Sequence, residues 1–428
     1  MKSSLDGLMI PSMKYSKRLL LSIFLCFSLI QCSDNSKPEK AVPTELPEQA
    51  EKIEPNRVLD EIPQHIQEVE NLTIFPGDSE PLYSIALIPA QSFGETGEPY
   101  LTRILGCVVD DHGGVIIHSA DANYEQILHV YNAYGTYHAQ LGRQGRGPGE
   151  YGNIVGIQAK AGKVFVLDYT SQRLNEYSTK DYSFMRSILL ENWKSGDGLR
   201  FGYIEARNDG NYLLVFSENR SKPGRLESKY QVMDHAGNKV SAEPLVFPYG
   251  FRIKVGQSIR PTMPITFLGT TLTALSHEDA LYAVWTNDFL IKKYDAKGEY
   301  QSAIYYPIQG SPFDLNEYSK TQLFSPKVGD IEKAFATMDE ELPENFPVVD
   351  KLMVDDKNRI WVAVPAGAER EYYEWWILNE TGELLAKLVL PKDQRIYDIK
   401  NGHLYSKETD EETGAEFVIK YRVELIEK

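Results

Sequence analysis

A hairpin pattern that recurs six times constrains the fold of this chain more than any other feature. Each copy is an apolar run, a polar turn containing Asp, Asn or Gly, and a second apolar run. The copies span 108–118, 158–168, 205–216, 276–285, 353–364 and 398–406. Asp, Asn and Gly tolerate the backbone conformations that tight turns between antiparallel strands require. The recurrence therefore predicts an all-β protein built from repeated hairpins.

A second hairpin follows the first in five of these units. In each, an apolar or aromatic residue stands four positions before a turn residue. The pairs are Tyr131 and Gly135, Tyr177 and Asp181, Met233 and Gly237, Tyr294 and Gly298, and Leu378 and Gly382. Two consecutive hairpins make a unit of four antiparallel strands, and the uneven spacing of the units indicates insertions between them.

Repeated four-stranded units are typical of a β-propeller, which closes into a ring and leaves few sheet edges exposed. The sixth unit ends with 416–425 and lacks an outermost strand, whereas the strand-like run 81–89 precedes the first unit. We expect these two segments to pair, because pairing satisfies the backbone groups of both edges. The prediction is a six-bladed propeller over residues 72–428, with a seven-bladed ring as the alternative.

Three segments also carry a resemblance to a known family. GRQGRGPGEY (142–151), VLDYTSQRLNEY (166–177) and VDKLMVDDKNRIWVAV (349–364) resemble the six-bladed, NHL-type β-propeller lipoproteins of Bacteroidetes-like bacteria. The resemblance implies the propeller fold and a location in the cell envelope. It implies no particular enzymatic activity, because that family has none in common.

The N-terminal residues are typical of an export signal. Lys14, Lys17 and Arg18 precede the apolar run 19–30, which is too short to span a bilayer as a helix. The run ends at Cys32, in a sequence that resembles a bacterial lipobox. We therefore predict a signal peptide over 1–31 and lipid attachment at Cys32; the alternative is an ordinary secretory signal. Translation could start at Met1 or at Met13.

The predicted tether covers residues 32–71. This segment is not expected to fold. It is rich in proline and acidic residues, and it contains no aromatic residue. Such a composition cannot bury enough apolar surface to offset the entropy of ordering the chain. We expect a disordered acidic segment that separates the propeller from a lipid anchor.

Charge and motif content exclude several classes of function. The net charge of −16 argues against a general nucleic-acid binder, which needs a basic surface. The eight histidines form no metal-binding motif, and three cysteines cannot form a thiolate zinc site. The adjacent pairs Asp110–Asp111 and Asp355–Asp356 occupy the same turn of different units, which turn chemistry alone explains. We expect no catalytic residue, no metal and no cofactor.

The weak candidates for ligand contact are Arg143, Arg146, Asp168 and Arg173. The first two lie in the Gly-rich segment 142–151, which we predict to be a crossover between an outer and an inner strand. Asp168 and Arg173 match the Asp and Arg that brace a turn in NHL repeats, so bracing is their expected role. The two arginines in an acidic protein form a local positive spot that favours a carboxylate or an acidic partner surface.

Three further segments have two interpretations each. The aromatic run Tyr372, Tyr373, Trp375 and Trp376 favours core packing over a sugar-stacking platform. Arg252, Lys254 and Arg260 form a basic island that binds an anion or is simply solvated. Residues 330–341 are predicted to form a helix that caps one mouth of the ring or packs on the rim of a blade.

Together these observations predict a monomeric, lipid-anchored envelope protein, most simply at the outer membrane. It would act as a binding module for a protein, peptide or glycan partner and contact the membrane only through its anchor. The alternative is a gluconolactonase-like hydrolase or lyase with a metal in the central channel. That alternative requires residues of inner strands, such as Glu205 and Asp398, to converge within metal-bonding distance.

Overall fold

The computed structural model describes residues 57–95, 99–196, 198–218, 223–241, 243–254, 262–321, 327–338, 341–410 and 412–428. The predicted signal peptide, Cys32 and Arg260 lie outside these residues. Within them, no helix is long and apolar enough to cross a membrane.

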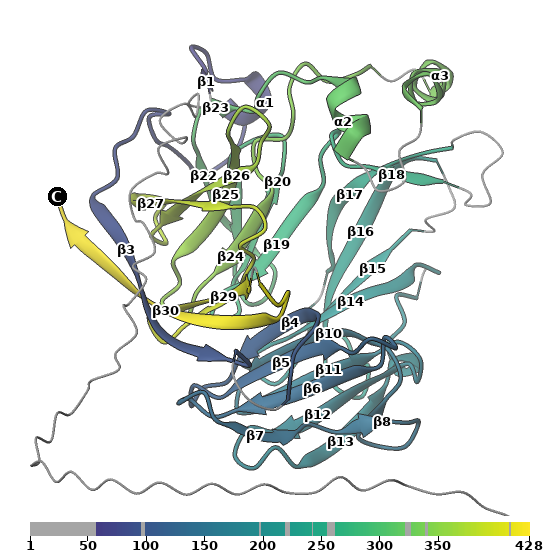
Figure 1. The fold of residues 1–428 in the computed structure, drawn as a ribbon. Coiled ribbons are helices and arrows are strands. Elements are labelled where there is room, and N and C mark those ends of the chain that lie inside the picture. Colours follow the sequence, from purple (N-terminus) through teal and green to yellow (C-terminus); the bar gives the residue numbers. More distant parts are fainter. Residues whose placement is uncertain are drawn as a thin grey trace, which may run out of the picture. The chain divides into compact units, whose positions relative to one another are not determined.

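The described residues form six antiparallel blades around a common centre (Figure 1). Blade 1 contains β4 (Ile104–Val109), β5 (Val115–Ala120), β6 (Gln126–Tyr131) and β7 (Tyr137–Gln140). Blade 2 contains β10 (Ile154–Lys160), β11 (Lys163–Asp168), β12 (Arg173–Ser178) and β13 (Phe184–Leu189). Blade 3 contains β14 (Arg200–Ala206), β15 (Tyr212–Ser217), β16 (Gly224–Met233), β17 (Leu245–Ile253) and β18 (Met263–Ile265).

The other three blades follow in chain order, and two of them take a strand from the N-terminal part. Blade 4 contains β19 (Thr271–Leu275), β20 (Leu281–Trp285), β21 (Leu290–Tyr294), β22 (Tyr300–Tyr305) and the parallel β2 (Leu72–Ile74). Blade 5 contains β24 (Lys351–Val354), β25 (Ile360–Ala366), β26 (Tyr372–Leu378) and β27 (Leu384–Pro391). Blade 6 contains β28 (Ile396–Lys400), β29 (His403–Thr409), β30 (Glu416–Glu427) and β3 (Tyr83–Phe93).

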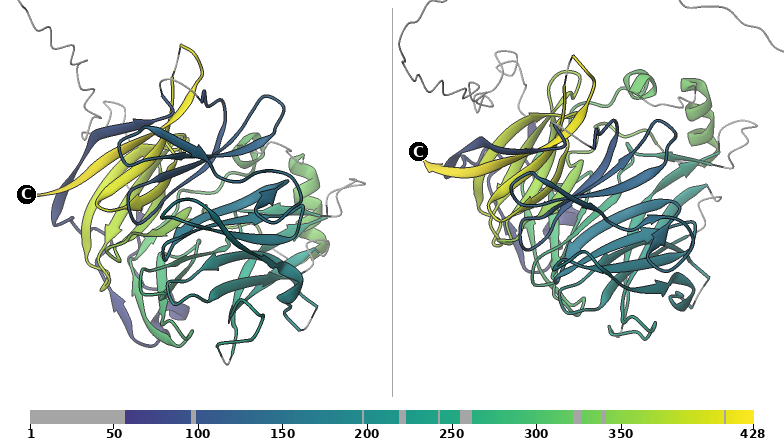
Figure 2. Two further views of the ribbon diagram at one scale, coloured as in Figure 1. Left: turned by 90° about the horizontal axis from the view of Figure 1, so that it is seen from below. Right: turned by 60° about the horizontal axis from the view of Figure 1, so that its bottom comes forward.

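The ring is closed as the sequence predicts. Strand β3 pairs antiparallel with β30, from Tyr83 opposite Glu427 to Phe93 opposite Val418. The two strands, from opposite ends of the described chain, lie side by side in both views of Figure 2. The six-bladed prediction and the pairing of 81–89 with 416–425 are therefore confirmed.

Apolar residues from facing blades form the core between them. Between blades 5 and 6, Trp361 and Trp375 are 0% and 1% exposed and pack with Leu87 of β3. Trp376 is buried on the other face of its strand, against blade 4. The prediction of core packing is confirmed for Tyr373, Trp375 and Trp376, because both faces of a blade are covered by neighbours, whereas Tyr372 is only half-buried.

The prediction of a disordered tether is wrong for residues 57–71. Residues 57–71 are folded: β1 (Arg57–Val58) pairs with β23 (Ile308–Gln309), and α1 (Gln64–Gln67) lies on blade 4. Ile66 of α1 is fully buried against Leu290 and Tyr305. A few spaced apolar residues, unremarkable in composition, are enough to cover an apolar patch that the blade would otherwise expose.

The predicted helix at 330–341 is present as α3 (Val328–Met338). Together with α2 (Leu315–Thr321), it belongs to the insertion between blades 4 and 5. Phe335 of α3 packs on Phe251 of β17 and on Phe267. Of the two expected positions for this helix, the rim of a blade is the one observed.

Candidate functional site: the two mouths of the channel

The first strand of each blade lies innermost, and these strands run in the same direction along a central channel. The innermost strands are β4, β10, β14, β19, β24 and β28. They end in the tight hairpins that the sequence pattern predicts, so we call that end of the channel the hairpin mouth. They begin where the chain crosses over from the preceding blade, and we call that end the crossover mouth.

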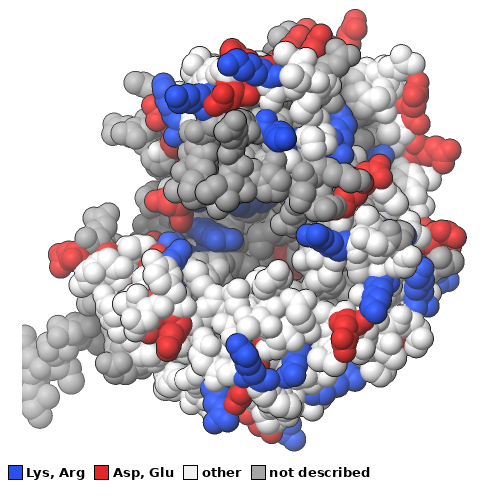
Figure 3. Space-filling model, turned by 90° about the vertical axis from the view of Figure 1, so that its right-hand side faces the viewer, with Lys and Arg blue, Asp and Glu red and all other residues white. Residues whose placement is uncertain are grey.

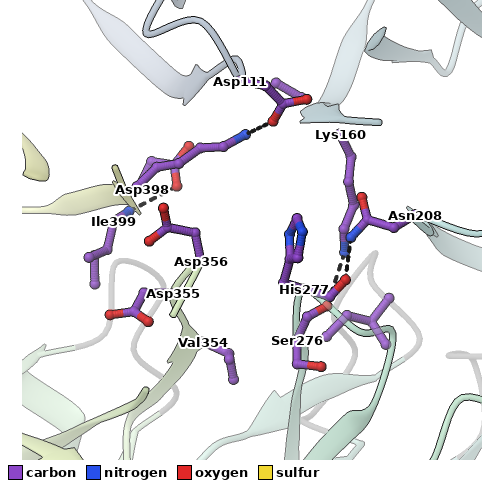
Figure 4. Close-up of a pocket in the computed structure, with 13 residues that line it drawn as sticks. Asp111, Lys160, Asn208, Ser276, His277, Val354, Asp355, Asp356, Asp398 and Ile399 are labelled. Carbon is purple, nitrogen blue, oxygen red and sulfur yellow. Dashed lines mark hydrogen bonds and ion pairs between the residues drawn. The ribbon is translucent and has the colours of Figure 1, made fainter. Parts of the chain in front are cut away.

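The hairpin mouth contains a cavity of about 120 Å³ to which every blade contributes (Figure 4). One polar or charged side chain comes from the end of each inner strand or its hairpin. These residues are Asp111, Lys160, Asn208, His277, Asp356 and Lys400. The cavity is therefore polar and of mixed charge, and only closure of the ring brings its lining together.

Much of this polar lining is engaged in holding neighbouring blades together. Lys400 of blade 6 forms a 2.7 Å ion pair with Asp111 of blade 1, which also accepts the N–H of Gly162 in blade 2 at 3.2 Å. Asp356 of blade 5 accepts the N–H of Asn401 in blade 6 at 2.7 Å. These bonds brace the ring at its hairpin ends.

The first carboxylate of each adjacent Asp pair stabilises its own turn. Asp110 accepts the N–H groups of His112 and Gly114, each at 2.8 Å. Asp355 likewise accepts the N–H groups of residues 357 and 359. Turn chemistry, as predicted, accounts for these two carboxylates, and the second carboxylate of each pair bonds the next blade.

Two acids of the inner strands are protonated more readily than usual. Burial raises the pKa of Glu205 to about 7, against the opposing effect of Lys160. Burial also raises the pKa of Asp398, whose carboxylate accepts the N–H groups of Val109 and Ile399 at 2.9 and 2.8 Å. Among the described residues, no group of three or more His, Cys, Asp or Glu side chains is placed to hold a metal ion.

The Gly-rich segment 142–151 is the crossover from blade 1 to blade 2, as predicted. It contains a small parallel ladder of β8 (Arg143–Gln144) and β9 (Glu150–Tyr151). Arg143 forms a 2.7 Å ion pair with Glu150, whose other oxygen accepts the N–H of Gly147 at 2.8 Å. Gly142 has a φ of 62°, and a Cβ there would lie 2.7 Å from the Tyr177 hydroxyl, so glycine is required.

The other residues predicted to contact a ligand are of two kinds: some are held by hydrogen bonds within the protein, and one has an exposed side chain. Asp168 is fully buried and accepts the N–H groups of Asn153 and Thr170 at 2.9 and 3.1 Å. Arg173 donates to the carbonyl of Arg146 at 3.1 Å, while the Arg146 side chain is exposed. Asp168 and Arg173 therefore brace the loop, and a ligand role for Arg143 and Arg146 stays a prediction.

Sequence reasoning missed a ring of cations at the crossover mouth. Among the described residues, four of the six inner strands begin at, or directly after, a basic residue: Arg103, Arg200, Lys351 and Arg395. The three arginines are exposed. Within the described part of the chain, none of the four forms an ion pair, and three stack on tyrosines, as Arg395 does on Tyr397 at 5.5 Å.

The face that carries the crossovers is hollowed. Figure 3 views the molecule from the side on which α2, α3 and β8 lie in Figure 1. Lys and Arg side chains are visible within the hollow and around it. A signal was present in the sequence, because each basic residue directly precedes or opens a strand-like run, but only the ring shows that these four strands share one mouth.

The fold and the two channel mouths define a six-bladed β-propeller with a polar channel. The model of a family described as "6-bladed beta-propeller" (DUF5128) matches residues 95–320, more than half of the 428-residue chain. The chain belongs to this family. A comparison with curated proteins found no match.

Solved structures with detectable similarity share little sequence with this chain. A Bacteroides fragilis protein described as exported is 12% identical, with a TM-score of 0.47 over 83% of this chain and 99% of that one. The PQQ-bound aldose sugar dehydrogenase of Streptomyces coelicolor is 12% identical, with a TM-score of 0.41 over 81% and 100%. Regucalcin, a calcium-binding protein of Agrobacterium tumefaciens, is 12% identical, with a TM-score of 0.34 over 82% and 96%. Such similarity carries no functional conclusion.

Proposed function

We propose that this chain is an exported, lipid-anchored binding module of the bacterial envelope that engages an acidic protein, peptide or glycan at its crossover mouth. The observation that carries the proposal is the placement of Arg103, Arg200, Lys351 and Arg395 around one mouth. In a chain with a net charge of −16, such a group produces a local positive potential that attracts and orients an acidic partner.

The distribution of charge supports the crossover mouth over the hairpin mouth. At the hairpin mouth, Lys400 is neutralised by Asp111, and Lys160 lies 3.8 Å from Asp279. At the crossover mouth, Arg200 and Arg395 are exposed and form no ion pair within the described residues. Exposed, unpaired arginines can donate in-plane to the carboxylates or sulfates of a partner with little desolvation cost.

A hydrolase or lyase acting in the channel is the second candidate. The observation in its favour is Glu205, because a carboxyl group with a pKa near 7 is suited to general acid–base catalysis at neutral pH. Enzymatic activity is the second candidate because Asp111 and Asp356, two carboxylates of the channel, already accept hydrogen bonds from neighbouring blades.

The binding proposal predicts a face-specific loss of polyanion binding. The triple variant Arg103→Gln, Arg200→Gln and Arg395→Gln should elute from immobilised heparin and polyglutamate at about half the salt concentration needed for the wild type, because fewer counterions are released. The matched control changes three exposed lysines in turns on the hairpin side, Lys180→Gln, Lys297→Gln and Lys357→Gln.

The control variant carries the same change in net charge and should elute close to the wild type. Equal losses in the two triple variants would contradict the proposal, since net charge alone would then explain binding. A third variant, Arg143→Ala with Arg146→Ala, tests whether the Gly-rich loop contributes to the same face. Circular dichroism of every variant checks that the fold is intact.

The proposed anchoring in the bacterial envelope predicts a covalent lipid at Cys32. The wild-type chain expressed in a bacterial host should partition into the detergent phase, whereas Cys32→Ser should remain in the aqueous phase, because one acyl group adds about 0.8 kcal/mol per buried methylene. Mass spectrometry of the N-terminal peptide measures the modification directly. Equal partitioning of the two proteins would contradict lipid anchoring and favour an ordinary secretory signal.

A further inference from the structure

A second cavity, separate from the hairpin-mouth cavity, lies where the insertion between blades 4 and 5 meets blade 5. Its volume is about 200 Å³. The insertion contributes Tyr318 of α2 and Phe346, and Phe267 adds a third aromatic wall. Blade 5 contributes Arg370, from the β25–β26 connection, and Lys392, directly after β27. Both connections lie on the crossover side of the blade.

Arg370 lies in the wall of this cavity. Its side chain stacks on Phe346, with 4.2 Å from the guanidinium carbon to the ring centroid. Its Nε is buried and has no hydrogen-bond partner among the described residues. Its backbone φ is 56°, a conformation that is uncommon for a residue other than glycine and that clusters at functional sites. Burial lowers the pKa of Arg370, against the opposing effect of the Asp350 and Glu317 carboxylates.

Lys392 is the second cation of the cavity. Burial lowers the pKa of Lys392, and the charge of Arg370 lowers it further, against the opposing effect of Asp350. The wall also contains the carboxylates Glu317, Asp350 and Glu369. None of the three forms an ion pair with Arg370 or Lys392 in the described residues, and Asp350 already accepts the hydroxyl of Tyr373. Within the described part of the chain, two cations thus line the cavity without an ion pair.

We propose that this cavity binds the oxyanion group, carboxylate or phosphate, of a small ligand whose apolar or aromatic part lies against Phe267, Tyr318 and Phe346. When a guanidinium stacks on an aromatic ring, its N–H groups point outward in a plane parallel to the ring. There they can donate two parallel hydrogen bonds to an oxyanion. Lys392 supplies the second positive charge. The site does not depend on partner binding at the crossover mouth.

Benzoate, phenyl phosphate and the neutral benzamide are the probes that test this proposal. Calorimetric titration and thermal unfolding of the full chain, at ionic strength matched with sodium chloride, should show saturable binding of at least one of the two anions and none of benzamide. The anion that binds more tightly identifies carboxylate or phosphate as the recognised group. Arg370→Gln should weaken that binding by about tenfold or more, and Arg370→Lys should recover only part of it, because lysine lacks the planar fork.

The control Lys333→Gln changes an exposed lysine of α3 that does not line the cavity, and it should bind the probe as the wild type does. Absence of saturable binding of both anions overturns the proposal, and so does equal affinity of wild type and Arg370→Gln. Should Arg370→Gln fail to fold, Lys392→Gln takes its place and should weaken binding by about threefold to tenfold. Arg370→Gln should keep wild-type retention on heparin, so failure here and failure of the crossover-mouth proposal are distinguishable.

Discussion

Removing residues 57–93 should abolish the cooperative folding of the whole ring. The deletion takes away β3, an eleven-residue strand that pairs with β30. It also uncovers the apolar residues that Ile85 and Leu87 bury between blades 5 and 6. An open ring has a bare edge on its last blade and an exposed core on a neighbouring one, so the remaining blades lose their closure. Differential scanning calorimetry should show no cooperative transition.

A peptide added in trans makes this experiment specific. A synthetic peptide of residues 79–95 should restore a cooperative transition to the truncated chain, and a scrambled peptide should not. In the full chain, Leu87→Asp should cost more than about 4 kcal/mol, because it buries an unpaired charge. Ser84→Asp, at an exposed position of the same strand, should cost less than about 0.5 kcal/mol. A stable, cooperatively folded truncation would contradict closure by β3.

Glu176→Ala should destabilise the protein by about 2–3 kcal/mol, because it removes hydrogen bonds to a buried carboxylate while its two cationic partners remain partly hydrated. Glu176 of β12 is fully buried and receives bonds from Lys163 at 2.9 Å, from Arg186 at 3.0 Å and from the Tyr212 hydroxyl at 2.5 Å. Tyr212 belongs to β15, so the carboxylate links blade 2 to blade 3. Its removal leaves two cations without their shared partner. In the native protein, hydrogen bonds from Arg186, Tyr212 and Lys163 outweigh burial and keep the pKa of Glu176 lowered.

Chemical denaturation of Glu176→Ala and of the matched control Glu191→Ala measures the effect. Glu191 is exposed, so its substitution should change the free energy of unfolding by no more than about 0.5 kcal/mol. Glu176→Gln keeps the shape and two hydrogen-bonding atoms and should fall between the two. A loss below about 1 kcal/mol for Glu176→Ala would show that the cations find other partners and that the link between these blades is not specific.

The charged groups at the crossover mouth come together only because the chain closes into a ring. Arg103, Arg200 and Arg395 are almost 300 positions apart at the extremes, and each is unremarkable in its own segment. The same applies to Arg370 and Phe346, which approach within 4.2 Å although they belong to a blade and to an insertion. No local pattern predicts such pairs, because contact between them depends on which segments the closed ring brings to one face.

The sequence by itself predicted the repeated hairpins, a six-bladed ring and the strand that closes it. Those features depend on local chemistry: Asp110 and Asp355 bond the N–H groups of their own turns, and alternating runs define where strands begin and end. The last blade has one unpaired edge strand, 416–425, so the sequence predicts that 81–89 pairs with it, and the structure confirms this pairing.

Only the tertiary structure decided which side chains meet and where the folded chain begins. Ile66 orders residues 57–71 because blade 4 offers it an apolar patch, and that patch exists only after the blade has formed. The cations of the crossover mouth and the guanidinium of Arg370, which stacks on Phe346, likewise acquire their environment from segments that only the fold brings together. Burial and electrostatic potential are properties of the closed ring, since both depend on distances that the linear order of residues does not contain.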